Sequence, residues 1–346
     1  MKILVFGAGV LGCNLARNFF RAGKDVTLLA RGAWGESIPK NGLRIKDKFS
    51  PRMSVSRIPV VTELKAEDKY DVIFVVLRYT QFDAILDTVS AGDDLPEVLK
   101  WQDSSRSPKS FVLVLGESYT GPVTVNLAHI PHILLGGSTG SGKSVLLKLL
   151  LMQALHKGAE VYITDFKGGV DFPKVWHEKC RMCFTEENLR YTLDQLVAVL
   201  EYRKGRLAET GCPNLDAYNE ATGDNLPRLV LACDEVAELL DKTGRSKEEK
   251  ERLGQIENRL ATLARLGRAF GIHLILATQR PDANILPGQI KNNLDFRVCG
   301  RADNVLSQII LDNTSAADQI PKDARGRFIT GNGAVFQGYL FDEKQL

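Results

Sequence analysis

Short apolar runs alternate with amphipathic stretches at the start of this 346-residue chain, and the alternation predicts strands connected by helices. The expected strands are residues 2–6, 25–30 and 71–77, and the expected helices are residues 10–22 and 81–89. Strands that alternate with helices in this way are typical of a βαβ unit with a parallel sheet. We therefore assign residues 1–90 to a first α/β segment.

The pattern changes at residues 91–110, which are rich in Ser, Asp, Gly and Pro, and we interpret this stretch as a junction. The second region, residues 111–346, begins with a predicted hairpin around residues 119–122. Buried strands are expected at residues 133–135, 161–164, 229–232 and 273–277, and helices at residues 145–155 and 189–207. The sequence thus predicts an α/β fold in both regions.

The composition is that of an ordinary globular protein, with 44% hydrophobic and 25% charged residues. No apolar run reaches the roughly 18 residues of a membrane span, and no signal peptide precedes the first strand, so we expect a cytoplasmic protein. Six cysteines lie far apart, which is typical of reduced thiols. An alternative is a zinc site, although the spacing of its candidate ligands matches no standard finger. Those ligands are His177, Cys180, Cys183 and Cys212.

Charge is distributed unevenly along the chain. Residues 1–90 hold 14 Lys and Arg against 9 Asp and Glu, a net charge of +5, out of 45 and 42 in the whole chain. The remainder therefore holds 31 basic and 33 acidic residues, a net charge of −2. A body of this charge does not coat nucleic acid, so any DNA binding by the second region must use local basic loops.

A phosphate-binding loop is the strongest chemical motif in the second region. The pattern GxxxxGKS at residues 137–144 follows a predicted buried strand and precedes a predicted helix, which is the context that a Walker A motif requires. Lys143 is expected to reach the β- and γ-phosphates of ATP, and Ser144 is expected to bind Mg²⁺. The residues expected to contact ATP are Gly137, Ser138, Thr139, Gly140, Ser141, Gly142, Lys143, Ser144 and Val145.

Two further strand ends supply the polar groups that ATP hydrolysis needs. The apolar run 229–232 leads to Asp234 and Glu235, which suit a Mg²⁺ ligand and a base that polarises the attacking water. Gln279 follows a third buried strand, where it is expected to sense the γ-phosphate, although a solvated turn residue is the alternative.

Three motifs carry a resemblance to the motor domain of the FtsK/SpoIIIE family of DNA translocases, over residues from about 111 to 342. They read PHILLGGSTGSGKS from residue 131, CDEVAEL from residue 233 and LARLGRAFGIHLILATQRP from residue 263. The resemblance implies a RecA-like P-loop NTPase that forms a ring, usually a homo-hexamer, around double-stranded DNA. A turn at residues 165–169, DFKGG, resembles versions from conjugative and integrative elements, which implies membrane-bound transfer machinery as a partner.

The same resemblance implies ATP hydrolysis between subunits, with an arginine from the neighbour completing each site. Arg297 and Arg301 are the candidates here. Pore loops of this family follow the Walker B strand, which points to residues 241–250. Lys242, Arg245 and Lys247 of this loop are candidate DNA-phosphate contacts, and a solvated charged loop is the alternative.

A second glycine loop lies at the start of the chain. Gly7, Gly9 and Gly12 form the GxGxxG fingerprint of a Rossmann-like dinucleotide-binding segment between a strand and a helix. The second strand ends in Arg31, which suits the 2′-phosphate of NADP better than the ribose hydroxyl of NAD. A Rossmann-like fold without a bound cofactor is the alternative.

Residues 1–90 resemble the N-terminal part of ketopantoate reductase. The resemblance rests on MKILVFGAGVLG at the start, VTLLAR from residue 26 and VVLRYTQ from residue 75. That family's helical C-terminal domain supplies its catalytic lysine, and the chain turns into the second region before reaching such a domain. We therefore expect a truncated Rossmann-like segment without reductase activity. The alternatives are an NADP-dependent oxidoreductase of this type, or a fusion of two families with no joint function.

Overall fold

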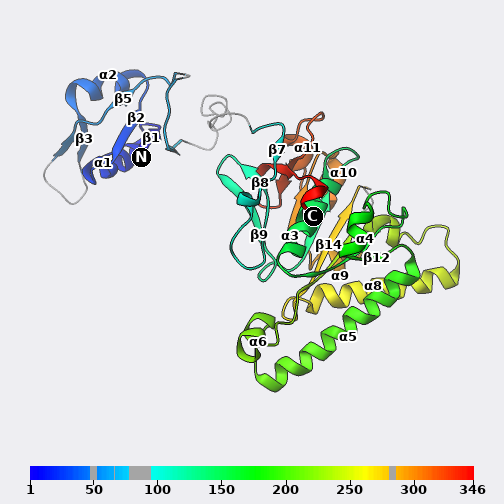
Figure 1. Ribbon diagram of the computed structural model, residues 1–346. Coiled ribbons are helices and arrows are strands. Elements are labelled where there is room, and N and C mark those ends of the chain that lie inside the picture. Colours follow the sequence, from blue (N-terminus) through cyan, green and yellow to red (C-terminus); the bar gives the residue numbers. More distant parts are fainter. Residues whose placement is uncertain (47–52, 66, 78–94, 280–285) are drawn as a thin grey trace. The chain divides into compact units, whose positions relative to one another are not determined.

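The computed structural model describes residues 1–46, 53–65, 67–77, 95–279 and 286–346 (Figure 1). Its contacts divide the chain into two compact units, Met1–Gly92 and Asp93–Leu346. Each unit has its own hydrophobic core, and each is α/β as predicted. Among the described residues, no helix combines the length and apolar character that crossing a bilayer demands.

Unit 1 is built on a parallel sheet in the order β5–β2–β1–β6 (Figure 1). Alternate side chains of its central strands enter the cores on opposite faces of the sheet, as the two-residue period of a strand requires. The expected helix at residues 81–89 lies outside the described residues. The elements are β1 Lys2–Phe6, α1 Val10–Arg21, β2 Asp25–Leu29, α2 Gly32–Asn41, β3 Leu43–Lys46, β4 Met53–Ser56, β5 Val60–Val61 and β6 Val72–Val75.

Unit 2 is built on a mixed sheet in the order β12–β11–β13–β14–β10–β15–β16–β17–β8–β9, with β7 paired to β17. The six strands from β12 to β15 run parallel, and the remaining neighbours in the series pair antiparallel. The strands are β7 Leu99–Lys100, β8 Val112–Ser118, β9 Gly121–Asn126, β10 Ile133–Gly136, β11 Glu160–Thr164, β12 Arg181–Cys183, β13 Leu229–Cys233, β14 Ile272–Thr278, β15 Phe296–Cys299, β16 Arg327–Thr330 and β17 Val335–Leu340.

Helices cover both faces of this sheet, and the long helices α5 and α8 run side by side (Figure 1). Ile133 and Leu135 of β10 enter one core with α3, whereas Leu134 enters the opposite core with α5 and α8. The helices are α3 Lys143–His156, α4 Lys174–Lys179, α5 Glu186–Thr210, α6 Leu215–Thr222, α7 Val236–Leu240, α8 Lys247–Leu266, α9 Gly288–Lys291, α10 Asn304–Leu311 and α11 Ser315–Gln319, with short 3₁₀ turns η3 Asp103–Ser105 and η4 Glu343–Gln345.

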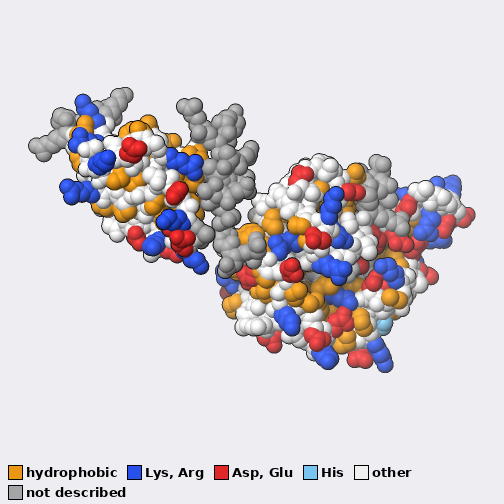
Figure 2. All heavy atoms as spheres, turned by 90° about the horizontal axis from the view of Figure 1, so that it is seen from above, with side chains coloured by type: hydrophobic (Ala, Val, Ile, Leu, Met, Phe, Trp, Pro, Cys, Tyr) orange, Lys and Arg blue, Asp and Glu red, His pale blue; other side chains and the backbone are white. Residues whose placement is uncertain are grey.

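The hairpin and the strands expected in the second region are present, and the long amphipathic helix extends beyond its predicted ends to Glu186–Thr210. The segment interpreted as a junction holds β7 and η3, and its described residues, from Leu95 onward, are part of unit 2. The β7 strand pairs with β17, and Arg327 donates a hydrogen bond to the Leu95 carbonyl at 2.8 Å. Basic and acidic side chains are intermixed over the face of unit 2 that Figure 2 shows, in keeping with its near-neutral charge.

Candidate functional site

The P-loop connects β10 to α3 and is held in place by contacts from its own unit. Ser138 N donates a hydrogen bond to the Arg301 carbonyl at 2.7 Å, and the Ser141 carbonyl accepts one from Gly326 N at 2.9 Å. Gly142 precedes α3 with a φ of 96°, a conformation that side chains other than glycine rarely adopt. The loop therefore leads directly to a helix N-terminus, whose free N–H groups favour anions.

The first two residues of α3 both contact Asp234, which follows β13. Lys143 Nζ donates a hydrogen bond to the main-chain oxygen of Asp234 at 2.7 Å and forms an ion pair with its carboxylate. Ser144 Oγ lies 3.0 Å from Asp234 Oδ2. The side chains of Lys143 and Asp234 are only 3% and 9% exposed, so the ion pair is buried. Three residues from the two predicted motifs thus converge on one point.

The same residues suit a divalent cation. Magnesium prefers hard oxygen ligands and retains several waters, so one hydroxyl and one carboxylate from the protein are an ordinary set. The Ser144 hydroxyl and the Asp234 carboxylate supply these oxygens side by side. Ser144 and Asp234, the two residues predicted to bind Mg²⁺, therefore have the chemistry and the placement that this ion needs.

Glu235 is fixed by the end of the neighbouring strand β14. Its Oε1 accepts a hydrogen bond from Thr278 Oγ1 at 2.7 Å, and its Oε2 accepts one from Gln279 N at 2.9 Å. The side chain of Gln279 turns to the P-loop, where its Oε1 accepts a hydrogen bond from Thr139 Oγ1 at 2.9 Å. Gln279 therefore links the carboxylate that follows Asp234 to the P-loop, because β14 lies between β13 and β10.

The two candidate arginines lie in different surroundings. Arg301 rests on the P-loop of its own chain, where it donates hydrogen bonds to the carbonyls of Thr139 at 2.6 Å and Lys322 at 2.8 Å. Arg297, on β15, forms an ion pair with Asp312 and donates to the Leu294 carbonyl at 3.1 Å. Both guanidinium groups are therefore engaged in contacts within their own chain.

The segment expected to be a pore loop is shorter than predicted, because α8 already begins at Lys247. A capping box formed by Ser246 and Glu249 fixes this helix start. Lys242 pairs with Glu257 at 2.6 Å, and Arg245 pairs with carboxylates of α5 and α8 at 3.3 Å. Of the three candidate DNA contacts, Lys247 stands exposed at the helix start, whereas the other two must exchange an ion pair for a phosphate.

The glycine loop of unit 1 has the close packing that its fingerprint predicts. A Cβ atom at Gly12 would lie 1.9 Å from the Gly7 carbonyl oxygen, so glycine is required there. The Gly9 carbonyl accepts the hydrogen bond from Cys13 N at 2.9 Å in the first turn of α1. Arg31 is exposed after β2, and its guanidinium carbon lies 5.8 Å from the Phe6 ring centroid. This geometry suits a dinucleotide phosphate.

The alternative zinc ligands are engaged in other contacts. His177 Nε2 pairs with the Phe172 carbonyl at 2.8 Å, and Cys183 Sγ pairs with the Thr192 hydroxyl at 3.3 Å. Burial raises the pKa of the Cys180 thiol to about 12. Within the described ranges, no group of three or more His, Cys, Asp or Glu forms a metal-binding cluster.

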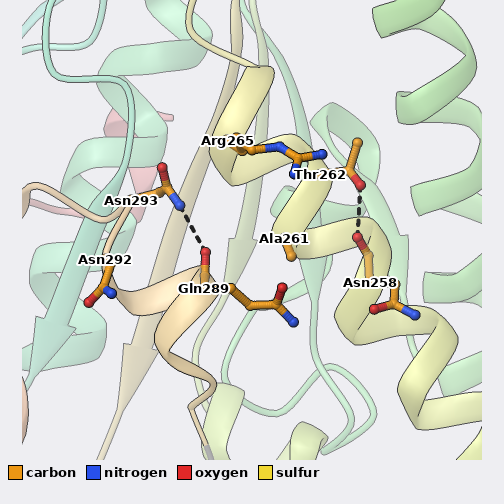
Figure 3. Close-up of a pocket in the computed structure, with 7 residues that line it drawn as sticks. All are labelled: Asn258, Ala261, Thr262, Arg265, Gln289, Asn292 and Asn293. Atoms are coloured by element: carbon orange, nitrogen blue, oxygen red, sulfur yellow. Dashed lines mark hydrogen bonds between the residues drawn. The ribbon is translucent and has the colours of Figure 1, made fainter.

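A polar hollow of about 480 Å³ lies between α8 and the α9 region, and no P-loop residue lines it (Figure 3). Its walls carry amide and hydroxyl groups and one guanidinium, that of Arg265, with no carboxylate. Thr262 Oγ1 and Asn293 Nδ2 are tied to main-chain oxygens four residues earlier, at 2.9 and 2.8 Å. None of the candidate site residues predicted from the sequence lines this hollow, although Arg265 belongs to the motif that begins at residue 263.

Sequence reasoning missed Thr278, which shares Glu235 with Gln279. The available signal was a hydroxyl at the last position of an otherwise apolar strand, next to the expected sensor residue.

Comparison with protein families divides the chain within one residue of the boundary between the two structural units. The model described as the FtsK/SpoIIIE family matches residues 94–283. The model described as ketopantoate reductase PanE/ApbA matches residues 3–93.

Individual relatives match the second region. DNA translocase FtsK of Helicobacter pylori strain J99 is 30% identical over 237 residues, which cover 64% of this chain and 27% of the relative. DNA translocase SftA of Bacillus subtilis is 30% identical over 268 residues, which cover 73% and 27%. The chain thus spans little more than a quarter of the length of these curated relatives.

Solved structures give a fuller match. The pCW3 conjugation coupling protein TcpA, in a monomer form with ATPγS, is 33% identical with a TM-score of 0.70, and the match covers 90% of this chain and 82% of that one. The cytoplasmic domain of the Thermomonospora curvata type VII secretion ATPase EccC is 23% identical with a TM-score of 0.55, which shows a shared fold.

Proposed function

Because the chain belongs to the FtsK/SpoIIIE family, we propose that unit 2 is an ATP-driven motor that moves double-stranded DNA. The observation that carries this proposal is the chain of contacts from the P-loop through Gln279 to Glu235. It joins the nucleotide site to a strand end that can report the state of the phosphates. A passive nucleotide-binding domain has no need of such a link.

Each polar residue of the site has a proposed part in hydrolysis. Lys143 exchanges its ion pair with Asp234 for the β- and γ-phosphates of ATP. Ser144 and Asp234 would hold Mg²⁺, which neutralises charge that develops on the phosphate oxygens. Glu235 orients the attacking water, and its two hydrogen bonds to β14 set the direction of its carboxylate. Gln279 passes the change at the phosphates to β14.

We further propose that the motor acts as a ring of identical subunits, with ATP bound near the subunit interfaces. Within this ring Arg301 would serve the ATP of its own chain, since it already contacts the P-loop carbonyl of Thr139. Lys247 is the strongest of the three candidate DNA contacts, because it is exposed at the start of α8. Its replacement by alanine should weaken DNA binding uniformly across sequences and reduce the salt dependence by about one counterion.

The DNA substrate is proposed to be that of a conjugative or integrative element. The support is the likeness to TcpA, which is described as a conjugation coupling protein. Such a role would place membrane-bound transfer proteins among the partners.

ATP hydrolysis by the purified chain, with and without double-stranded DNA, tests the proposal. We expect DNA to raise the rate several-fold, and we expect Lys143→Ala and Glu235→Gln to abolish it. Lys148→Ala is the matched control, because Lys148 lies on the same helix and pairs with Glu343 outside the site. Hydrolysis that ignores DNA, or that survives Lys143→Ala, would refute the proposal.

A second candidate function concerns unit 1 alone, and the position of Arg31 beside the glycine turn favours it. We propose that unit 1 retains a dinucleotide site and has no reductase activity, since the ketopantoate reductase model matches residues 3–93 only. Binding of NADPH should quench the fluorescence of the protein in the wild type and not in Arg31→Ala. Oxidation of NADPH with ketopantoate at an enzymatic rate would contradict the absence of reductase activity.

A further inference from the structure

Asp165 lies at the end of β11, in the strand position next to Asp234. The last paired residues of β11 and β13 are Thr164 and Cys233, so the following residues of the two strands are Asp165 and Asp234. Asp165 N donates a hydrogen bond to the Cys183 carbonyl at 3.0 Å, which continues the ladder toward β12. Neighbouring strands lie about 4.8 Å apart, so the two aspartates leave the sheet side by side.

The carboxylate of Asp165 is buried and only half satisfied. The residue is 4% exposed, and its Oδ1 accepts a hydrogen bond from Lys167 N at 3.0 Å. Its Oδ2 is buried and has no hydrogen-bond partner among the described residues. Buried carboxylate oxygens ordinarily accept hydrogen bonds, because an unpaired one has lost its hydration without replacement. Lys167 does not supply this contact with its amine, which pairs with Asp171 at 2.7 Å.

The surroundings of Asp165 belong to the nucleotide site. A small hollow of about 60 Å³ is lined by Asp165 together with Asp234 and Glu235. A volume of this size accommodates at least one water molecule. Asp171 lines the same hollow from the turn after β11, so two acidic residues of that turn region can be compared in one environment.

We propose that Asp165 is a third carboxylate of the ATP site, with its Oδ2 accepting a hydrogen bond from a water in the shell of the divalent cation held by Ser144 and Asp234. Mg²⁺ retains several waters when it binds with nucleotide phosphates, and groups that orient such outer ligands change metal affinity by about 10- to 100-fold. Asp165 is therefore a positioning residue. The inference rests on the proposed ATPase function and deepens it.

The affinity of the site for Mn²⁺ in the presence of ATPγS, measured by electron paramagnetic resonance, tests the inference. Asp165→Asn keeps an oxygen as acceptor for Lys167 N, while it removes the negative charge and puts an NH₂ group in place of Oδ2, so the turn should fold. We expect its Mn²⁺ affinity to fall about 10-fold, with ATPγS binding in the absence of metal unchanged. Asp171→Asn is the matched control. It also removes a carboxylate from this hollow, but that carboxylate already pairs with Lys167.

Equal Mn²⁺ affinity in the wild type and Asp165→Asn would overturn the inference, and so would an equal loss in Asp171→Asn. If Asp165→Asn does not fold, Asp165→Ser preserves a short acceptor for Lys167 N and must show the same loss. A wild-type chain that binds no ATPγS would instead refute the proposed function, and this inference with it. Metal-dependent ATPγS binding that is unchanged in Asp165→Asn would refute the inference alone.

Discussion

Two histidines in the interior of unit 2 should make its stability sensitive to mild acid. His132, just before β10, accepts a hydrogen bond on Nδ1 from Leu274 N at 2.9 Å. His273, on β14, must donate from Nδ1 to the Pro131 carbonyl at 3.0 Å, because Nε2 faces the Arg228 guanidinium at 3.1 Å. Protonation of His132 would put an N–H on Nδ1, facing the N–H of Leu274. Protonation of His273 would put an N–H on Nε2, facing the guanidinium of Arg228. Both rings are therefore neutral in the folded protein.

The magnitude follows from the pKa of His132. Burial lowers this pKa from 6.5 to about 4, against the opposing effect of the nearby Ala264 carbonyl. Above pH 6.5 neither the folded nor the unfolded state binds the proton, so the group does not affect stability. Between pH 6.5 and 4 the unfolded state binds it and the folded state does not, so stability falls as the pH falls. At pH 5 the loss from His132 alone is about 2 kcal/mol. His273, whose pKa burial also lowers, adds a loss of the same sign.

Urea unfolding at pH 8 and pH 5, followed by tryptophan fluorescence, measures this loss. A Trp34→Phe background leaves Trp101 and Trp176, which are both buried in unit 2, as reporters of that unit. His132→Asn is the informative variant, because its amide oxygen can replace Nδ1 as acceptor for Leu274 N and takes up no proton. The wild type should lose about 2 kcal/mol more than His132→Asn between the two pH values.

The change in unfolding free energy between pH 8 and pH 5 is measured for each protein, and the two changes are subtracted. This subtraction removes the contribution of surface carboxylates, since these titrate alike in both proteins. An equal loss of unfolding free energy in the wild type and His132→Asn would refute the reasoning. Protonation of His132 would then be as favourable in the folded state as in the unfolded state.

Three further predictions concern the site and its support. Gln279→Ala should reduce DNA-stimulated ATP hydrolysis more than 10-fold while nucleotide affinity changes less than about 3-fold, because the residue links strand ends rather than gripping phosphate; paired hydrolysis and binding assays check this. Arg228→Ala should destabilise unit 2 by about 2 kcal/mol in urea, since the buried guanidinium loses its packing over the Phe111 ring, 5.0 Å from the ring centroid, and its 2.6 Å bonds to Asp216. Asp216→Asn should be milder, because the Asp216 side chain is 60% exposed and asparagine keeps one acceptor for Arg228. Ser246→Ala should lower stability by about 1 kcal/mol through loss of the α8 cap, whereas Ser246→Asp should restore it.

The P-loop and the Walker B end were predictable because each is a local pattern with a demanding backbone. A buried strand, a turn that needs left-handed glycines and a helix start must follow one another within about a dozen residues, as the stretch from β10 to α3 does. The strand after which Glu235 stands is likewise an uninterrupted apolar run. Such motifs do not depend on the rest of the chain for their recognition.

Contacts between distant segments were not predictable in the same way. The bond between Thr139 and Gln279 joins residues 140 positions apart, and its existence follows from strand order rather than from either motif. The start of α8 could have been predicted, although residues 241–250 were assigned to a loop. Ser246 and Glu249 have the spacing of a capping box, which indicates a helix that begins at Lys247. Asp165 stood in a turn singled out by resemblance, but its unpaired oxygen is visible only once β11 and β13 are placed in register.

The order β13–β14–β10 makes β14 the natural element to couple ATP to movement. Its last residue and the one after it hold both oxygens of Glu235, and the Gln279 side chain reaches across to Thr139 on the P-loop. Under the proposed function, a phosphate that attracts the Thr139 hydroxyl must compete with Gln279, and any shift of Gln279 also moves a hydrogen-bond donor of the base. Nucleotide binding and the orientation of Glu235 are then linked through Gln279, because this residue contacts both the P-loop and Glu235.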